Sequence, residues 1–185
     1  MSRPLISIPQ QMDLKHTAHG VVITRYWRHR AGLLLIPFCP LWVMMFYAFK
    51  SLSAGIDDPM ITVLIPLTHA ALGVATVYLL LAMLINRTRI TVTSSEVSVT
   101  HGPLPWRGEG KVPVGQIDQL FSKEIHRTTH HGLSKRYQVW VALTDGTQSR
   151  LVDVGLEADK ALYIEQQIEL ALHIRDQLIP GELPR

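Results

Sequence analysis

The sequence has few of the residues that crosslink a chain or carry out catalysis. Its 185 residues include one cysteine, Cys39, which excludes an intramolecular disulfide. Neither a Gly-rich phosphate loop, nor a metalloprotease motif, nor a Ser-His-Asp set is present. We therefore expect neither an enzyme nor a bound cofactor. Cys39 lies in an apolar run, where we interpret it as a small apolar side chain.

Charged side chains are missing from two long apolar segments, residues 31–49 and residues 60–85. A helix rises about 1.5 Å per residue and the hydrocarbon layer is roughly 30 Å thick, so the second segment can cross it with a little to spare. The linker of residues 50–59 is short, so the two helices would run antiparallel. The sequence therefore predicts a transmembrane helical hairpin over residues 31–85.

Basic side chains stand outside the two apolar segments rather than between them. Three arginines precede the first segment and two follow the second, whereas the linker contains a single basic residue, Lys50. By the positive-inside rule, we expect both termini in the cytoplasm and the linker on the outer side. Aromatic residues beside the arginines suit the headgroup layer, so the expected membrane-interface residues are Arg25, Tyr26, Trp27, Arg28, Arg30, Arg87 and Arg89.

The region that follows the hairpin has no net charge. Residues 86–185 hold twelve Lys or Arg and twelve Asp or Glu, whereas residues 1–30 hold five basic residues and one acidic residue. A nucleic-acid-binding domain concentrates positive charge on itself, so nucleic acid is not an expected partner.

The segment before the hairpin, residues 1–30, is predicted to be a cytoplasmic arm followed by the basic-aromatic lead-in. Residues 1–20 are polar, contain two prolines and show no sustained period, which indicates a disordered or loosely docked arm. Residues 21–27 fit either an interfacial segment or a strand that pairs with the domain after the hairpin. The sequence does not choose between these two interpretations.

A period of two begins after the hairpin and indicates antiparallel strands with one buried face. Asp145 and Gly146 form a tight-turn signal between two of them. The expected strands are residues 90–92, 97–100, 117–125, 137–143 and 148–154, with residues 111–114 leading into the third of them.

A helical period follows over residues 156–174. It places one apolar stripe on a face of the helix and leaves Lys160, Glu165 and Glu169 elsewhere; the stripe is Ala161, Ile164, Ile168, Ala171 and Leu172. The prediction is an α+β soluble domain over residues 86–175, an antiparallel sheet or barrel capped by a C-terminal helix, with a tail at residues 176–185.

Five short segments carry a resemblance to a known family: Ile23–Trp27, Asn86–Thr88, Gly102–Trp106, Ile117–Leu120 and Asp145–Gly146. On these segments the chain resembles small bacterial membrane proteins with two transmembrane helices followed by a bacterial pleckstrin-homology-like domain. The resemblance implies a small PH-like sheet or barrel capped by a helix, held at the bacterial inner membrane. It implies no catalytic residues.

The segment between the strands at residues 117–125 and 137–143 is rich in basic side chains and histidine. We hypothesise that it binds an anionic lipid headgroup or a protein partner; the candidate residues are Lys123, His126, Arg127, His130, His131, Lys135 and Arg136. An ordinary solvated hairpin loop remains the alternative. A metal site of the three histidines is the weakest interpretation, because the loop has no cysteine, so no metal is expected.

His69 is the one ionisable side chain deep in the second apolar segment. It is either a functional residue or a side chain that hydrogen-bonds the opposite helix or its own backbone near Pro66. Ala71 and Ala75 bracket Gly73, a small-residue face that suits close helix packing or self-association.

The function expected from these patterns is a membrane-anchored interaction module. Its expected partners are membrane lipids and a membrane or cytoplasmic protein, with self-association through the hairpin left open. The alternative is an accessory subunit of a membrane transport complex, in which His69 would matter more than the soluble domain.

Overall fold

The computed structural model describes residues 6–28, 30–129 and 132–174, apart from the side chains of residues 31, 127–129, 132–134 and 153–154. The chain forms two compact units. Unit 1 combines the described residues up to Tyr26 with those from Arg87 onward, and unit 2 spans Trp27–Asn86.

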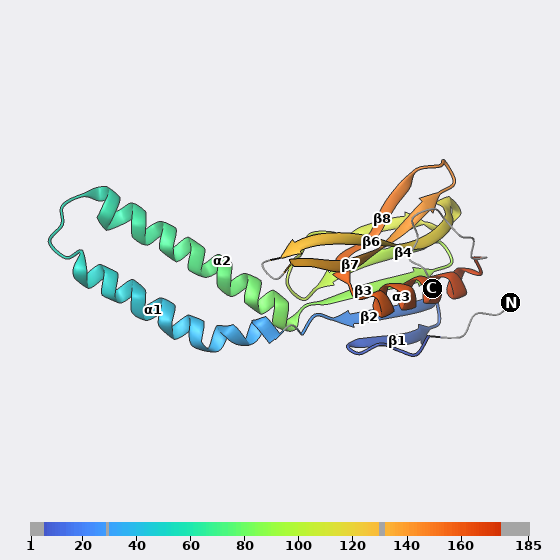
Figure 1. The fold of residues 1–185 in the computed structure, drawn as a ribbon, viewed down its shortest axis with the longest axis horizontal. Coiled ribbons are helices and arrows are strands. Elements are labelled where there is room, and N and C mark those ends of the chain that lie inside the picture. Colours follow the sequence, from blue (N-terminus) through green and yellow to red (C-terminus); the bar gives the residue numbers. More distant parts are fainter. Residues whose placement is uncertain (1–5, 29, 130–131, 175–185) are drawn as a thin grey trace. The chain divides into compact units, whose positions relative to one another are not determined.

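Unit 1 contains two antiparallel sheets and a C-terminal helix, α3 (Ala158–Leu172) (Figure 1). In the first sheet, five strands pair in chain order: β1 (Met12–Thr17), β2 (Gly20–Tyr26), β3 (Arg87–Thr93), β4 (Glu96–Gly102) and β5 (Gly110–Pro113). In the second sheet, three strands pair: β6 (Ile117–Thr129), β7 (Gly132–Leu143) and β8 (Gln148–Leu156). The expected α+β class is confirmed.

The described strands form no closed barrel, because β5 and β6 belong to different sheets. Pro113 ends β5, and proline offers no N–H to continue a strand ladder. A 3-10 turn at Val114–Gln116 then leads the chain into β6.

The two sheets and α3 share one hydrophobic core. Side chains that alternate along the strands meet the helix stripe there; those with at most 1% exposure include Ile23, Ile90, Val99, Leu120, Val139, Ile164 and Ile168. The helix predicted over residues 156–174 is therefore present, with its apolar stripe on the core.

Two acidic residues of α3 depart from the expected pattern. Glu165 and Glu169 are only 1% and 5% exposed, although the sequence placed them away from the apolar stripe. Polar groups cover the flanks of the helix: Gln119 Nε2 of β6 lies 3.5 Å from Glu169 Oε1, and the Ile6 N–H donates to Gln166 Oε1 at 2.9 Å. Segments distant in sequence thus bury side chains that a helical period alone would leave exposed.

The prediction of an arm without regular structure is wrong for residues 12–20, which form β1 and the start of β2. β2 pairs with β3 from Gly20 opposite Thr93 to Tyr26 opposite Arg87, so the strand alternative for residues 21–27 is the one observed. Gly20 permits this pairing because a Cβ there would overlap the Val92 carbonyl oxygen. The sequence does not reveal this strand pairing, because both strands are short and one face of β1 is polar.

Unit 2 consists of two long apolar helices. The first begins as a 3-10 turn at Arg30–Leu34 and continues as α1 (Leu35–Leu52), and the second begins as a π-helix at Met60–Leu64 and continues as α2 (Ile65–Ile85). The spans Gly32–Leu52 and Met60–Ile85 are long and apolar enough to cross a membrane, and only 6% and 11% of their most apolar windows are buried. The first span starts one residue later and ends three residues later than the predicted segment of residues 31–49.

Gly73 allows the two helices of unit 2 to pack closely. A Cβ at Gly73 would lie 2.2 Å from Trp42 Nε1, so the Trp42 ring occupies the space that a side chain would need. Ala71 and Ala75, the other members of the small-residue face, are exposed. The contact made by Gly73 is therefore internal to the hairpin.

Candidate functional site

The basic segment predicted as a loop is a continuous β-hairpin. β6 and β7 stay paired up to Thr129 opposite Gly132, so Lys123, His126, Lys135 and Arg136 all lie on strands. Arg127 pairs with Ser134 through the backbone, and its side chain lies outside the described residues, as do His130 and His131. Within the described residues no group of three His, Cys, Asp or Glu side chains could hold a metal ion.

One face of this β-hairpin carries a carboxylate at the centre of the basic residues. Glu124 Oε1 lies 3.1 Å from Lys135 Nζ and 3.4 Å from His126 Nδ1, and the Tyr137 hydroxyl donates to Glu124 Oε2 at 3.4 Å. The hydrogen bond from Lys135 holds the pKa of Glu124 below its usual value, and the same contact raises the pKa of Lys135. The carboxylate of Glu124 thus balances the positive charge of Lys135 within the protein.

The opposite face carries an exposed lysine over an aromatic ring. Lys123 Nζ lies 5.2 Å from the centre of the Trp140 ring, within the range of a cation–π attraction. The Trp140 indole N–H donates to Gln138 Oε1 at 3.2 Å, and its ring stacks on Phe121 with centroids 6.5 Å apart. Trp140 is therefore fixed in place, and Lys123 presents its charge beside it.

Strand alternation therefore divides the predicted basic cluster between two faces. His126 and Lys135 share a face with Glu124, whereas Lys123 and Arg136 belong to the face of Trp140. The sequence could not assign these faces, because the assignment depends on how far the strands extend toward the turn. Glu124 and Trp140 are the two residues of this region that the predicted site omitted.

Arg136 lies against the backbone rather than in open solvent. A Cβ built on Gly155 would sit 3.4 Å from both Cβ and Cγ of Arg136, so the alkyl part of the arginine covers this glycine of β8. Its half-buried position leaves Lys123 as the more accessible cation of the two.

The predicted membrane-interface arginines differ in exposure. Arg87 and Arg89 are exposed on β3, on the face opposite the buried Thr88 and Ile90. Arg25, by contrast, faces the interior, and its Nη1 is buried without a hydrogen-bond partner among the described residues. Desolvation lowers the pKa of Arg25, while the charge of Glu157, which lies at the start of α3, acts in the opposite direction.

The remaining interface residues lie where the chain joins the two units. Tyr26 ends β2 in unit 1 and is half-buried. In unit 2, Trp27 is half-buried and its N–H donates to the Asn86 carbonyl at 3.0 Å. Arg28 and Arg30 are exposed.

His101 is a buried histidine that the sequence gave no reason to select. Its Nδ1 lies 3.1 Å from Thr88 Oγ1, and its backbone N–H donates to Glu109 Oε1 at 3.1 Å. Burial lowers the pKa of His101, opposed by a hydrogen bond with the Gly108 backbone and by the charge of Glu109, while Arg25 lowers it further. The imidazole is therefore held toward its neutral form.

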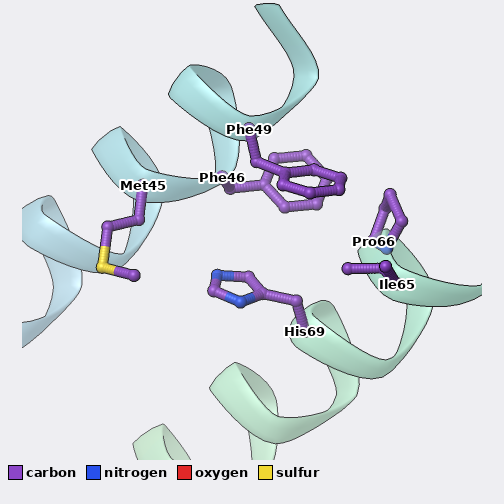
Figure 2. Close-up of a pocket in the computed structure, with 6 residues that line it drawn as sticks. All are labelled: Met45, Phe46, Phe49, Ile65, Pro66 and His69. Atoms are coloured by element: carbon purple, nitrogen blue, oxygen red, sulfur yellow. The ribbon is translucent and has the colours of Figure 1, made fainter. Parts of the chain in front are cut away.

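A second candidate site lies inside unit 2, around His69. The imidazole stacks on Trp42 with ring centroids 3.9 Å apart and an angle of 15° between the planes. Figure 2 shows the His69 ring projecting from α2 toward α1. The ring borders a cavity of about 110 Å³, lined by Met45, Phe46, Phe49, Ile65, Pro66 and His69.

The His69 hydrogen bond expected as one alternative is not made by Nε2. This nitrogen is buried and has no hydrogen-bond partner among the described residues. Aromatic stacking on Trp42 fixes the ring instead. The sequence identified the polar residue but not its aromatic neighbour.

No protein-family model matches the chain, and no curated protein matches it. The pleckstrin-homology-like assignment stays a prediction.

Proposed function

We propose that this protein is a non-catalytic interaction module anchored in the bacterial inner membrane by unit 2. In this proposal both termini and unit 1 are cytoplasmic, and unit 1 is a pleckstrin-homology-like module that binds anionic lipid headgroups. The observation that carries the anchoring is the exposed apolar surface of Gly32–Leu52 and Met60–Ile85, since such surface is unfavourable in water and favourable in hydrocarbon.

Lys123 and Trp140 support the choice of a headgroup as ligand. An exposed ammonium beside an amphipathic indole suits the headgroup layer, where tryptophan is enriched and cations are attracted to anionic lipid. The chain leaves unit 1 after Tyr26 and returns at Arg87, so two covalent connections tether the module to the proposed anchor.

The topology is tested by cysteine labelling in intact cells and in permeabilised cells. In a Cys39→Ala background, Ala54→Cys lies in the linker and Ser94→Cys lies in the exposed turn between β3 and β4. We expect a membrane-impermeant maleimide to label the first variant in intact cells and the second only after permeabilisation. The reverse pattern would contradict the proposed orientation.

Headgroup binding is tested with the full chain in phosphatidylcholine nanodiscs, mixed with phosphatidylglycerol vesicles or phosphatidylcholine vesicles and sedimented. We expect salt-sensitive binding to the anionic vesicles that Lys123→Gln weakens about fivefold, from about 1 kcal/mol per cation near the surface. Lys111→Gln is the matched control, because Lys111 is exposed on the other sheet and pairs with Glu96 at 3.2 Å. If the protein binds neither type of vesicle, headgroup binding is contradicted and a protein partner becomes the expected ligand.

A further inference from the structure

The loop between β4 and β5, residues 103–109, lies at the end of the first sheet where the chain enters unit 1 from α2. β4 pairs with β3 up to Gly102 opposite Arg87, and α2 ends at Ile85, two residues before Arg87. β4 runs toward this end of the sheet, and β5 starts at Gly110 and pairs back along β4. The loop therefore joins two strands at the same end at which the chain passes between the units.

Covalent geometry limits how far this loop can begin from the end of α2. Two residues of chain span at most about 7 Å, and the Cα atoms of paired strand residues lie about 5.5 Å apart or less. The Cα atom of Gly102 is therefore at most about 13 Å from that of Ile85, whatever the orientation of unit 1. With unit 2 spanning a bilayer, Ile85 lies near the edge of the hydrocarbon, and the headgroup layer beyond it is roughly 5–7 Å thick. The loop then begins in this layer or next to it.

The loop is apolar, whereas the turns at the opposite end of the sheet are polar. Residues 103–106 read Pro-Leu-Pro-Trp, and the exposed Arg107 follows them. At the other end, the turn between β1 and β2 reads Ala-His, and the turn between β3 and β4 reads Ser-Ser. Of these three connections, the apolar one is the one at the end where the chain joins unit 2.

The residue types of the loop suit the boundary between headgroups and hydrocarbon. Tryptophan is enriched at this boundary, and an arginine beside it can extend its charge into the headgroup layer. Pro103 and Pro105 are exposed and have no backbone N–H, so the loop brings few unpaired donors toward an apolar layer. Leu104 and Trp106 are half-buried, so each still offers part of its apolar surface.

His101 fixes the base of the loop. Its backbone N–H donates to Glu109 Oε1 at 3.1 Å, which closes the loop, and its Nδ1 lies 3.1 Å from Thr88 Oγ1 on β3. Gly108 has a φ of 97°, which favours glycine, and a Cβ there would lie 3.5 Å from His101 Nε2. The shape of the loop is thus set within unit 1, and preorganisation of this kind lowers the cost of making a contact.

We propose that residues 103–107 form a second lipid contact, which lies in the headgroup layer and fixes the orientation of unit 1 on the bilayer. The inference rests on the proposed membrane insertion of unit 2, and it is independent of headgroup binding at Lys123 and Trp140. The chain already connects the units after Tyr26 and before Arg87. The loop adds a third point of attachment, so unit 1 does not turn freely about these two connections.

The test measures the depth of an NBD fluorophore on single cysteines, in a Cys39→Ala background. The full chain is placed in phosphatidylcholine nanodiscs that contain doxyl-labelled lipid as the quencher. Pro105→Cys reports on the loop, Ser94→Cys on the turn at the other end of the sheet, and Leu79→Cys, at a position 46% exposed on α2, on the insertion of unit 2. We expect strong quenching at residues 79 and 105 and little at residue 94.

Two variants, made in the Pro105→Cys protein, test whether the loop itself makes the contact. Leu104→Asp places a carboxylate at the apolar boundary, so quenching at residue 105 should fall to the level at residue 94. Ala18→Asp adds the same charge at an exposed position at the other end of the sheet, and it should leave quenching unchanged. Arg107→Glu changes an exposed side chain, and in nanodiscs that contain phosphatidylglycerol it should also lower quenching at residue 105.

Each alternative outcome has a distinct meaning. Quenching at residue 79 without quenching at residue 105 would overturn the loop contact and leave the anchor in place. Equal quenching at residues 94 and 105 would also overturn it, because unit 1 would then meet the bilayer along its length. Quenching at residue 105 that neither loop variant lowers would mean that the covalent connection alone holds the label there. Without quenching at residue 79 the proposed membrane anchoring fails, and the loop contact fails with it.

Discussion

Tyr26 and Arg87 lie directly opposite each other in the antiparallel pair of β2 and β3, although sixty residues separate them in the chain. The whole of unit 2 thus occupies the position of a β-hairpin loop within the first sheet of unit 1. Two strands of that sheet precede the apolar helices and three follow them. The fold of unit 1 therefore depends on chain segments from both sides of unit 2.

This relationship predicts a soluble form of unit 1. Replacing residues 27–86 by Asn-Gly should close β2 onto β3, because this dipeptide suits the two-residue turn of an antiparallel hairpin. We expect the shortened protein to be soluble and to melt cooperatively. Circular dichroism, thermal melting and the dispersion of amide NMR signals are the measurements.

A chain of residues 86–185 alone is the informative comparison. It lacks β1 and β2, so it exposes the edge of β3 and loses Ile23, which is fully buried in the core. We expect this fragment to aggregate or to show poorly dispersed amide signals. Equal stability of the fragment and the Asn-Gly protein would show that β1 and β2 contribute little to the fold.

Glu124 should restrain the binding of anionic vesicles. Lys135 lowers the pKa of Glu124, so this carboxylate is charged at neutral pH and offsets the charge of Lys135. Glu124→Gln is expected to strengthen binding by up to about fivefold, because it removes one negative charge from among the basic residues of the hairpin. Nanodisc co-sedimentation at low and moderate salt measures the change.

Glu96→Gln is the control for the Glu124 variant. Glu96 pairs with Lys111 at 3.2 Å in the other sheet, so its removal changes the net charge equally. An equal gain in both variants would indicate that net charge alone decides binding, and that the β6–β7 hairpin is not the site.

Gly73 should be intolerant of larger side chains. In Gly73→Val the added Cβ would overlap Trp42, and overpacking of this kind costs about 1–3 kcal/mol. We expect a lower melting temperature of the hairpin in detergent and a shifted Trp42 emission. Ala75→Val, at an exposed position of the same helix, should behave as the wild type. If the two valine variants melt alike, close packing at Gly73 does not stabilise the hairpin.

The sequence predicts the parts of this fold that repeat a local pattern. Charge-free runs locate both apolar helices. Alternation locates the strands β3, β4, β6, β7 and β8, and a helical period locates α3. β1 was missed because its contribution to the core is one buried residue, Met12, and its partners come from β2. A strand of this kind is stabilised by pairing with another strand, which no local pattern reports.

The candidate sites show the same division. Composition singled out the basic segment and His69, but the aromatic residues that contact Lys123 and His69 come from other strands or helices. Trp140 reaches Lys123 across the sheet, and Trp42 reaches His69 from the other helix. Such pairs follow from register and helix packing, so they become visible only in the folded chain.

His101 should make the stability of the protein depend on pH. Burial holds its folded-state pKa below the unfolded value of about 6.5, so between these two pKa values the unfolded chain binds more protons than the folded chain. Stability is therefore fully present above pH 6.5 and is lost as the pH falls through the folded-state pKa. We expect the melting temperature of the full chain in nanodiscs to fall between pH 7.5 and pH 5.5.

The contribution of His101 is isolated by difference, because the chain contains nine histidines. His101→Gln keeps a polar side chain that can bond Thr88 Oγ1 but cannot be protonated, so its melting temperature should fall less over the same interval. His16→Gln removes an exposed histidine of β1 and serves as the control. A pH dependence of His101→Gln as steep as that of the wild type would mean that protonation of other groups drives the loss of stability, and that the folded protein accommodates a charged imidazole beside Thr88.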